Sequence, residues 1–163
     1  MSLQVKKEMN YQETVEKYSN MVYRLAYFYT NCKYDADDIF QEVFLKYLQN
    51  KKQFENEEHK KAWLIKVTIN SCKKMWLSCW KRKIISLNDD EIKFEMDEDI
   101  GLYNEIKKLP QKYRVVIHLF YYEQYSIKDI SNVLRQKEST IRTWLTRARK
   151  LLKNQIKEED FNV

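Results

Sequence analysis

One glycine and one proline among 163 residues are too few to supply the turns of a sheet-rich protein, so the composition predicts an all-α fold. Hydrophobic residues make up 44% and charged residues 33%, as in ordinary globular domains, and no apolar run is long enough to span a membrane. The net charge of +6 divides into +5 on residues 1–82, −5 on residues 83–104 and +6 on residues 105–163. Two basic modules around an acidic connector suggest that both bind a polyanion, the alternative being that surplus lysine only keeps a small protein in solution.

The first basic module is predicted to contain three helices. Apolar residues recur at helical spacing over residues 10–30, and Asp35 has the character of an N-cap for a second helix that runs to about Asn50. A third helix is expected over residues 58–81. The inward residues of the second helix are expected to be Ile39, Val43, Phe44 and Tyr47 or Leu48.

The second helix also carries acidic and amide side chains, which are Asp37, Asp38, Gln41 and Glu42. Paired carboxylates occur in acid–base and metal sites, but no nucleophile converges with these residues in the sequence, and no glycine-rich loop is present to hold a phosphate. A polar face for a protein partner is the simpler interpretation. We therefore expect no enzymatic activity.

The third helix is dense in cations and aromatic rings. Lysines bind phosphates and aromatic faces stack on unpaired bases, while the amide of Asn70 lies one turn from Lys66 and Lys74 and can hydrogen-bond a base edge. This pattern predicts a face that binds single-stranded nucleic acid. Alternatively, the rings belong to the core and the lysines form a solvated face. Trp63 is expected in the core and Trp80 partly exposed.

The acidic connector is expected to be a mobile linker, because its like charges repel and dilute the apolar residues. The predicted boundaries are 5–82 for the first domain, 83–104 for the linker and 105–160 for the second domain. In the second domain a short helix should end near Leu109, and Pro110 suits the start of the next helix. Three further helices are expected over residues 111–122, 127–134 and 138–156.

The last two of these helices have the pattern of a helix-turn-helix. A polar break at residues 135–138 separates two helical periodicities, and the second places Ile141, Leu145, Ala148 and Leu152 on one face. A helix that packs by one such stripe presents its other side to the major groove of DNA. The residues around that other side are Arg142, Thr143, Thr146, Arg147 and Arg149.

The cysteines and histidines show no metal-ligand spacing. Cys32, Cys72 and Cys79 are odd in number and form no CxxC pair, which predicts free thiols in a reducing cytoplasm. His59 and His118 stand alone. From this spacing we expect no metal, and we expect no cofactor. The first residues lack the apolar segment of a secretion signal, so we expect a cytoplasmic protein.

Three segments carry patterns that occur together in one family. Residues 35–45 are DADDIFQEVFL, residues 62–70 are AWLIKVTIN, and residues 109–114, LPQKYR, precede the helix-turn-helix. In this order they resemble the region-two signature, the promoter-melting helix and region four of the extracytoplasmic-function (ECF) sigma factors of bacterial RNA polymerase. The resemblance implies a three-helix region-two domain and a helix-turn-helix region-four domain on a flexible acidic linker. It also implies a non-catalytic subunit that directs transcription initiation.

The resemblance further implies roles for individual residues. Those expected to bind core polymerase are Asp38, Gln41 and Glu42. Those expected to bind the opened minus-ten element are Lys66, Asn70, Lys73 and Lys74, with the loop at residues 54–58 near a flipped base. Those expected at the minus-thirty-five duplex are Ser139, Thr140, Arg142, Thr143, Thr146, Arg147 and Arg149.

The expected partners are core RNA polymerase, promoter DNA and an anti-sigma factor. One alternative is a helix-turn-helix transcriptional regulator with a helical partner-binding domain, which would bind duplex DNA alone. Another is a helical adaptor protein whose charges are only solvated. The sequence departs from the family at Arg135, where a glycine is usual, and a non-glycine residue in a left-handed turn costs about 1 kcal/mol.

Overall fold

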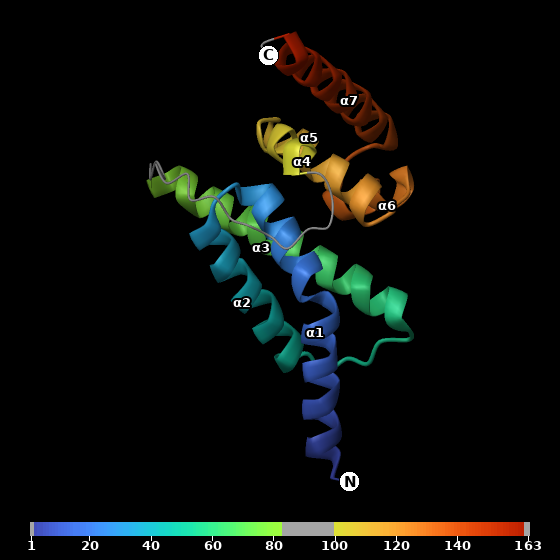
Figure 1. The fold of residues 1–163 in the computed structure, drawn as a ribbon. Helices are drawn as coiled ribbons and strands as arrows, with labels where there is room; N and C mark the ends of the chain where they lie inside the picture. The colour runs from blue at the N-terminus through green and yellow to red at the C-terminus, as the bar shows by residue number, and fades with distance from the viewer. Residues whose placement is uncertain (1, 83–99, 162–163) are drawn as a thin grey trace. The chain divides into compact units, whose positions relative to one another are not determined.

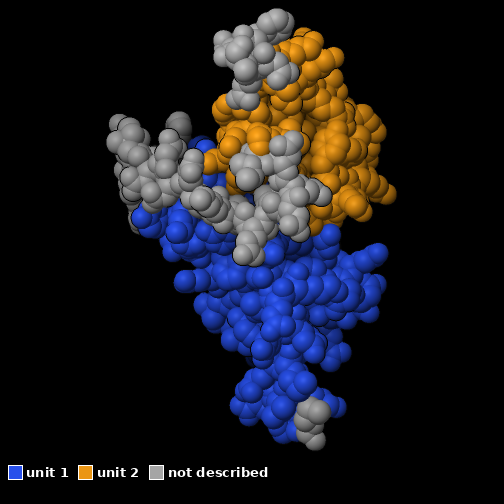
Figure 2. Space-filling view, in the orientation of Figure 1, with its two compact units in different colours: residues 1–88 blue, residues 89–163 orange. Residues whose placement is uncertain are grey.

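The computed structural model describes residues 2–82 and 100–161, and all regular secondary structure in these ranges is helical (Figure 1). The chain divides into two compact units, residues 1–88 and 89–163, which Figure 2 colours separately. The predicted all-α fold is therefore confirmed for the described part of the chain. Most of the predicted acidic linker, residues 83–104, lies outside the described residues, which resume at residue 100.

The first unit contains three long helices that each pack against the other two, because every helix carries an apolar stripe along one side. They are α1, Leu3–Thr30; α2, Lys33–Gln49; and α3, Glu57–Arg82. Burial of one large aliphatic side chain contributes about 1.5–3 kcal/mol, so this core accounts for much of the stability of the unit. Its largest fully buried side chains are Leu25, Ile39, Leu64, Ile65 and Ile69.

The start of α2 differs from the prediction. Asp35 is not the N-cap, since Cys32 takes that place in an extended conformation and Asp35 lies in the first helical turn. Asn31 ends α1 in a left-handed conformation, with φ 53°, and this turn lets α2 begin directly after it. Of the two predicted inward alternatives at the other end of α2, Tyr47 is buried and Leu48 is 42% exposed.

The second unit contains four α-helices and one π-helical segment among its described residues. They are α4, Ile100–Lys107; α5, Gln111–Ile117; η1, His118–Tyr122; α6, Ile127–Leu134; and α7, Glu138–Phe161. Helix α7 packs against α4, α5 and α6. The helix α4 begins within the range predicted as linker. The largest fully buried side chains are Ile106, Leu109, Leu119, Ile130, Ile141, Leu145 and His118.

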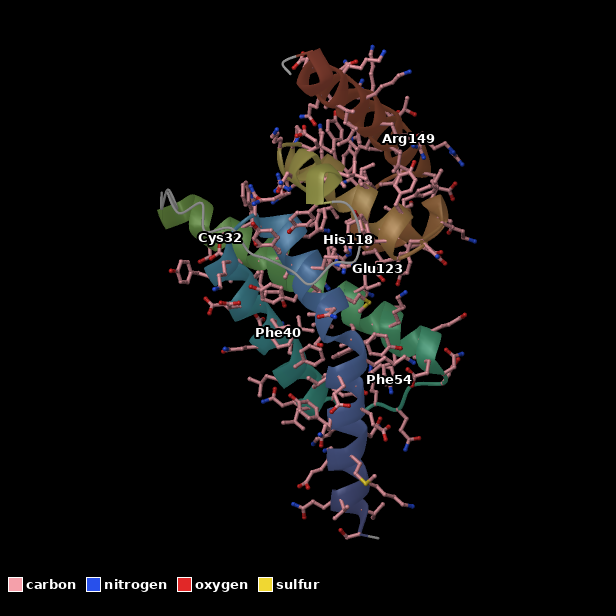
Figure 3. All side chains as sticks on the ribbon, viewed as in Figure 1. Cys32, Phe40, Phe54, His118, Glu123 and Arg149 are labelled. Atoms are coloured by element: carbon pink, nitrogen blue, oxygen red, sulfur yellow. The ribbon has the colours of Figure 1, made fainter. Side chains whose placement is uncertain are left out.

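The π-helical segment η1 continues α5 with one wider turn. The Glu123 N–H donates to the His118 carbonyl at 3.2 Å, five residues back. His118 is fully buried, its ring stacks on Tyr122, and its Nε2 lies 3.4 Å from Glu123 Oε1 (Figure 3). The turn thus encloses a polar pair inside the second unit.

Both ends of α6 are closed by local hydrogen bonds. Ser126 and Asp129 form a capping box at the N-terminus, with the Asp129 N–H donating to Ser126 Oγ at 3.1 Å. At the C-terminus Arg135 is left-handed, with φ 55° and ψ 45°, and the N–H groups of Arg135 and Gln136 both donate to the Ser131 carbonyl. Arg135 therefore takes the left-handed conformation that a glycine would adopt without strain.

Candidate nucleic-acid interface

One face of α3 carries cations and an amide. Lys66, Asn70 and Lys74 are exposed and Lys73 is half-buried. At 3.6 residues per turn these positions fall within roughly 100° of arc, so their side chains form a single stripe. The four residues predicted for the minus-ten element are therefore brought together on one surface of the first unit.

Aromatic rings gather at the N-terminal end of α3. Tyr11 stacks on Tyr47 with ring centroids 6.0 Å apart, and Tyr47 stacks on Phe54 with centroids 6.1 Å apart. Trp63 is half-buried and meets Tyr47 and Phe54 edge-on, at 6.1 and 5.6 Å. Trp63 was predicted in the core and instead forms part of this aromatic cluster, while the side chain of Trp80 lies outside the described part of the chain.

The rings of Tyr11, Tyr47 and Phe54 border a pocket of about 740 Å³ that lies between the α2–α3 loop and the N-terminal part of α1. Figure 3 shows Phe54 on this loop, beside α1. The volume falls in the range of small-ligand sites. The polar rim of the pocket includes Lys7, Asn10, Lys51, Lys52 and Gln53.

The loop that carries Phe54 is anchored by His59. The His59 N–H donates to Asn56 Oδ1 at 2.8 Å, which caps α3, and the Glu55 N–H donates to His59 Nδ1 at 3.2 Å. The His59 ring also meets Phe54 edge-on at 5.4 Å. His59, which stands alone in the sequence, therefore positions the aromatic residue of the loop.

A hydrogen-bonded network lies beneath the pocket and joins α1, α2 and α3. Glu57 accepts from Tyr18 Oη at 2.7 Å and from Lys60 Nζ at 3.0 Å. Lys60 Nζ also lies 3.4 Å from Thr14 Oγ1, which lies 3.1 Å from Tyr47 Oη. The hydrogen bonds from Tyr18 and Lys60 lower the pKa of Glu57 to about 2. Burial, together with the carboxylate of Glu57, raises the pKa of Tyr18.

The predicted polymerase-binding residues lie on α2. Asp38 and Gln41 are exposed, whereas Glu42 is half-buried and forms an ion pair of 2.6 Å with Lys46. The hydrogen bond from Lys46 lowers the pKa of Glu42, so Glu42 is held as a carboxylate against the helix. Helical spacing places three exposed apolar side chains on the face of Asp38 and Gln41. They are Tyr34, Leu45 and Leu48.

The second helix of the helix-turn-helix is α7. Of its predicted apolar stripe, Ile141, Leu145 and Ala148 are buried and Leu152 is half-buried. The exposed positions include Ser139, Arg142, Thr143, Thr146 and Arg147, with Thr140 half-buried. Within this face Arg142 pairs with Glu138 at 3.1 Å, and the hydroxyls of Thr143 and Thr146 donate to carbonyls one turn back. The exposed face therefore carries the guanidinium groups of Arg142 and Arg147. It also carries the methyl groups of Thr143 and Thr146, whose rotamers are fixed by these hydrogen bonds.

Arg149 lies at the edge of this face. Its Nε donates to Tyr121 Oη at 2.6 Å, and its guanidinium lies 5.4 and 5.6 Å from the ring centroids of Phe120 and Tyr121. Stacking on aromatic rings fixes the direction of the guanidinium. Arg149 is therefore positioned by η1, whereas Arg142 is paired with Glu138 of its own helix.

Several residues of these surfaces have no signal in the sequence. Tyr11 and Lys7 line the pocket only because the α2–α3 loop packs beside the N-terminal part of α1. Tyr121 gives no sequence signal either, since it lies in the π-helical segment η1 and meets Arg149 only in the folded unit. The exposed Leu45 was detectable, since an apolar residue in a polar helical stripe marks a contact surface.

A basic helix-turn-helix unit and a second helical unit with a cation-lined aromatic site define a DNA-binding protein of two modules. The family description "Sigma-70 region 2" matches residues 14–82, and "Sigma-70, region 4" matches residues 101–152. The chain belongs to the sigma-70 family of RNA polymerase sigma factors and is of the ECF type. It is a non-enzymatic subunit that binds core polymerase and promoter DNA and directs promoter recognition.

Known relatives extend over nearly the whole chain. RNA polymerase sigma factor SigV of Bacillus subtilis is 29% identical over 146 residues, which are 86% of this chain and 87% of SigV. ECF RNA polymerase sigma factor SigW of the same organism is 26% identical, over 91% of this chain and 89% of SigW.

Solved structures share the fold. Sigma factor RpoE of Bartonella quintana, in complex with the anti-sigma factor NepR, matches with a TM-score of 0.71 at 17% identity, over 91% of this chain and 97% of RpoE. CnrH in complex with the cytosolic domain of CnrY matches with a TM-score of 0.62 at 16% identity, over 93% of this chain and 90% of CnrH. In the described part of this chain, no helix combines the length and apolarity needed to cross a membrane.

Proposed function

We propose that this sigma factor contacts its promoters at two elements through two domains. Residues 5–82 bind core polymerase and the opened minus-ten element, residues 105–160 bind the minus-thirty-five duplex, and residues 83–104 link them. The observation that carries the proposal is that each compact unit exposes a cationic helical face, one on α3 and one on α7. The net charges of +5 and +6 on the two basic blocks support it.

At the minus-ten element, Lys66, Lys73 and Lys74 hold phosphates of the unpaired strand and Asn70 contacts a base edge. This assignment is supported by their common face and by the nearby aromatic pocket, whose volume accommodates one flipped base. The loop at residues 54–58 forms the wall of that base site. Cations beside aromatic rings are the combination that single-stranded nucleic acid requires.

Core polymerase binds the exposed face of α2 through Asp38, Gln41 and Glu42. Exposed Leu45 beside these polar groups supports a protein contact, because an apolar side chain in such a face gains from burial on binding. The ion pair with Lys46 gives Glu42 a second role, which is to fix the polar edge of this face against α3.

At the minus-thirty-five element, α7 enters the major groove. Ser139 and Thr140 lie in its first turn, where backbone N–H groups hold a phosphate. The base-reading residues are Arg142, Thr143, Thr146 and Arg147. Arg149, directed by Tyr121, holds a backbone phosphate at the edge of the groove.

The chain acts in the cytoplasm, where its template and core polymerase are found, and an anti-sigma factor restrains it. The second part of this proposal is supported by the two structural neighbours described above. One of them, RpoE, is in complex with the anti-sigma factor NepR, and the other, CnrH, is in complex with the cytosolic domain of CnrY. An inhibitor that covers the exposed faces of both domains would block every contact proposed here.

Transcription in vitro tests these assignments. Core polymerase supplemented with this chain should initiate at a specific promoter, and no promoter-specific initiation would refute the proposal. Asn70→Ala should impair promoter opening, detected by permanganate reactivity, more than it impairs duplex binding, and Asn20→Ala, an exposed amide on α1, is the matched control. Arg147→Ala should weaken minus-thirty-five duplex binding by about 1–3 kcal/mol, whereas Lys157→Ala near the end of α7 should not.

A further inference from the structure

The N-terminal part of α1 extends beyond the family match. Region 2 is matched from residue 14, yet α1 begins at Leu3. Residues 3–10 are exposed, and Lys7, Asn10 and Tyr11 line the aromatic pocket together with the α2–α3 loop. These extra turns of helix therefore form one wall of a pocket whose other walls belong to the matched domain.

We infer that this N-terminal extension, residues 3–13, is part of the single-stranded DNA site. Tyr11 stacks on one unpaired base in the pocket, and Lys7 binds an adjacent phosphate. The inference rests on the proposed minus-ten function of α3, and it adds a contact that region 2 by itself does not supply.

The position of Tyr11 suits a stacking platform. Its ring is half-buried against Tyr47 at a centroid distance of 6.0 Å and an interplanar angle of 20°. Tyr47 is in turn buried, stacks on Phe54 and bonds Thr14 through its hydroxyl. A ring held by this support loses little conformational entropy when a base stacks on it.

The charges around the pocket favour a polyanion. Lys7, Lys51 and Lys52 are exposed on its rim, while the ammonium of Lys60 is bound by Glu57 in the floor. Exposed lysines next to flat aromatic surfaces match alternating phosphates and bases. The amides of Asn10 and Gln53 add groups that can hydrogen-bond a base edge.

The pocket also lies within reach of the proposed strand path. Lys60 and Asn70 are ten residues apart on α3, which is roughly 15 Å along the helix axis and about 80° around it. A strand that contacts Asn70 and runs toward the N-terminus of α3 can span this separation with a few nucleotides.

The test uses the full chain bound to core polymerase and a single-stranded, fluorescent oligonucleotide. Its sequence is the non-template strand of a promoter that this complex transcribes. Tyr11→Leu should weaken binding roughly 5- to 100-fold, because it keeps an apolar side chain but removes the ring face. Tyr11→Phe should bind like the wild type, which separates stacking from any loss of the hydroxyl.

A series of oligonucleotides with one abasic site each locates the stacked base. At one position, and at no other, the abasic substitution and Tyr11→Leu should be non-additive, as expected for a direct contact. Lys7→Ala should reduce the slope of log K against log salt by about 0.7, the value for one phosphate of a single strand. Lys6→Ala, an equally exposed lysine outside the pocket lining, is the matched control and should leave the slope unchanged.

The outcomes separate this inference from the proposed function. Wild-type binding by Tyr11→Leu and Lys7→Ala, with weakened binding by Asn70→Ala, would overturn the inference and leave the minus-ten assignment intact. Wild-type binding by Asn70→Ala would refute that assignment itself. If Tyr11→Leu and Lys7→Ala bound oligonucleotides normally but lost affinity for core polymerase, the extension would be a protein contact and the inference would be wrong.

Discussion

Replacement of Glu57 by glutamine tests the network that joins α1 to α3. Tyr18 and Lys60 donate to different oxygens of Glu57, and glutamine keeps one of these two acceptors, so the change removes the negative charge and one hydrogen bond. The Lys60 side chain is only 11% exposed, and loss of the partner of a buried charge costs about 3–5 kcal/mol. Glu57 itself is 56% exposed, and solvent screening reduces the expected loss to about 1–2 kcal/mol.

The assay is urea unfolding of the full chain, followed by tryptophan fluorescence. Trp63, Trp76 and Trp80 all lie in the first unit, so a Trp144→Phe background makes the signal report that unit alone. Lys17→Ala is the matched control, because it removes the outer, largely exposed ion pair with Glu57 and a cation–π contact with Tyr18, and should cost less than about 1 kcal/mol. If Glu57→Gln and Lys17→Ala lowered the free energy of unfolding equally, the proposed contribution of the buried Lys60 would be wrong.

The same variant has a defined dependence on pH. The pKa of Glu57 is lowered to about 2 in the folded chain, below the value of about 4.3 for a free glutamate. A lowered carboxyl pKa stabilises the fold above the unfolded pKa, and this contribution is lost as the pH falls from about 5 towards 2. The difference in unfolding free energy between wild type and Glu57→Gln should therefore shrink over that interval. A difference that is the same at pH 7 and pH 3 would contradict this assignment.

Three further predictions concern the second unit. Arg135→Gly should raise the free energy of unfolding by up to about 1 kcal/mol in urea titrations, because glycine adopts φ 55° without strain, and an equal gain from Arg135→Ala would contradict this reason. Ser126→Ala should lower stability by about 1 kcal/mol in thermal unfolding through loss of the capping box, and an unchanged midpoint would refute that role. Tyr121→Phe should weaken minus-thirty-five duplex binding several-fold in fluorescence titrations, since Arg149 loses its 2.6 Å hydrogen bond; unchanged affinity would remove Arg149 from the interface.

The helices and the family followed from the sequence because both depend on local patterns. The apolar stripe Ile141–Leu145–Ala148 predicted the buried side of α7, and the near absence of glycine and proline excluded sheets. The start of α2 was missed because a left-handed Asn31 shortens the connection, and such a conformation leaves little trace in residue type.

The surfaces were less predictable than the helices. The stripe of Lys66, Asn70 and Lys74 was visible from its spacing on one helix. The pocket was not, because Tyr11 and Phe54 belong to different elements and approach only when the three helices pack. The ion pair of Glu42 with Lys46 could be predicted, because the two residues are four positions apart on a helix. Its effect could not, because Glu42 is half-buried only when α3 packs beside it.

The π-helical turn η1 makes the direction of Arg149 sensitive to chain length. A π-turn holds one residue more than an α-turn, and each residue rotates the following side chains by about 100°. Deletion of one residue between positions 118 and 122 would restore a regular α-helix and keep the apolar stripe of α5. The phenol of Tyr121 would then turn away from α7, and Arg149 would lose its anchor. An insertion or deletion of a single residue at this point would therefore change the proposed DNA contact of Arg149 without changing any residue of α7.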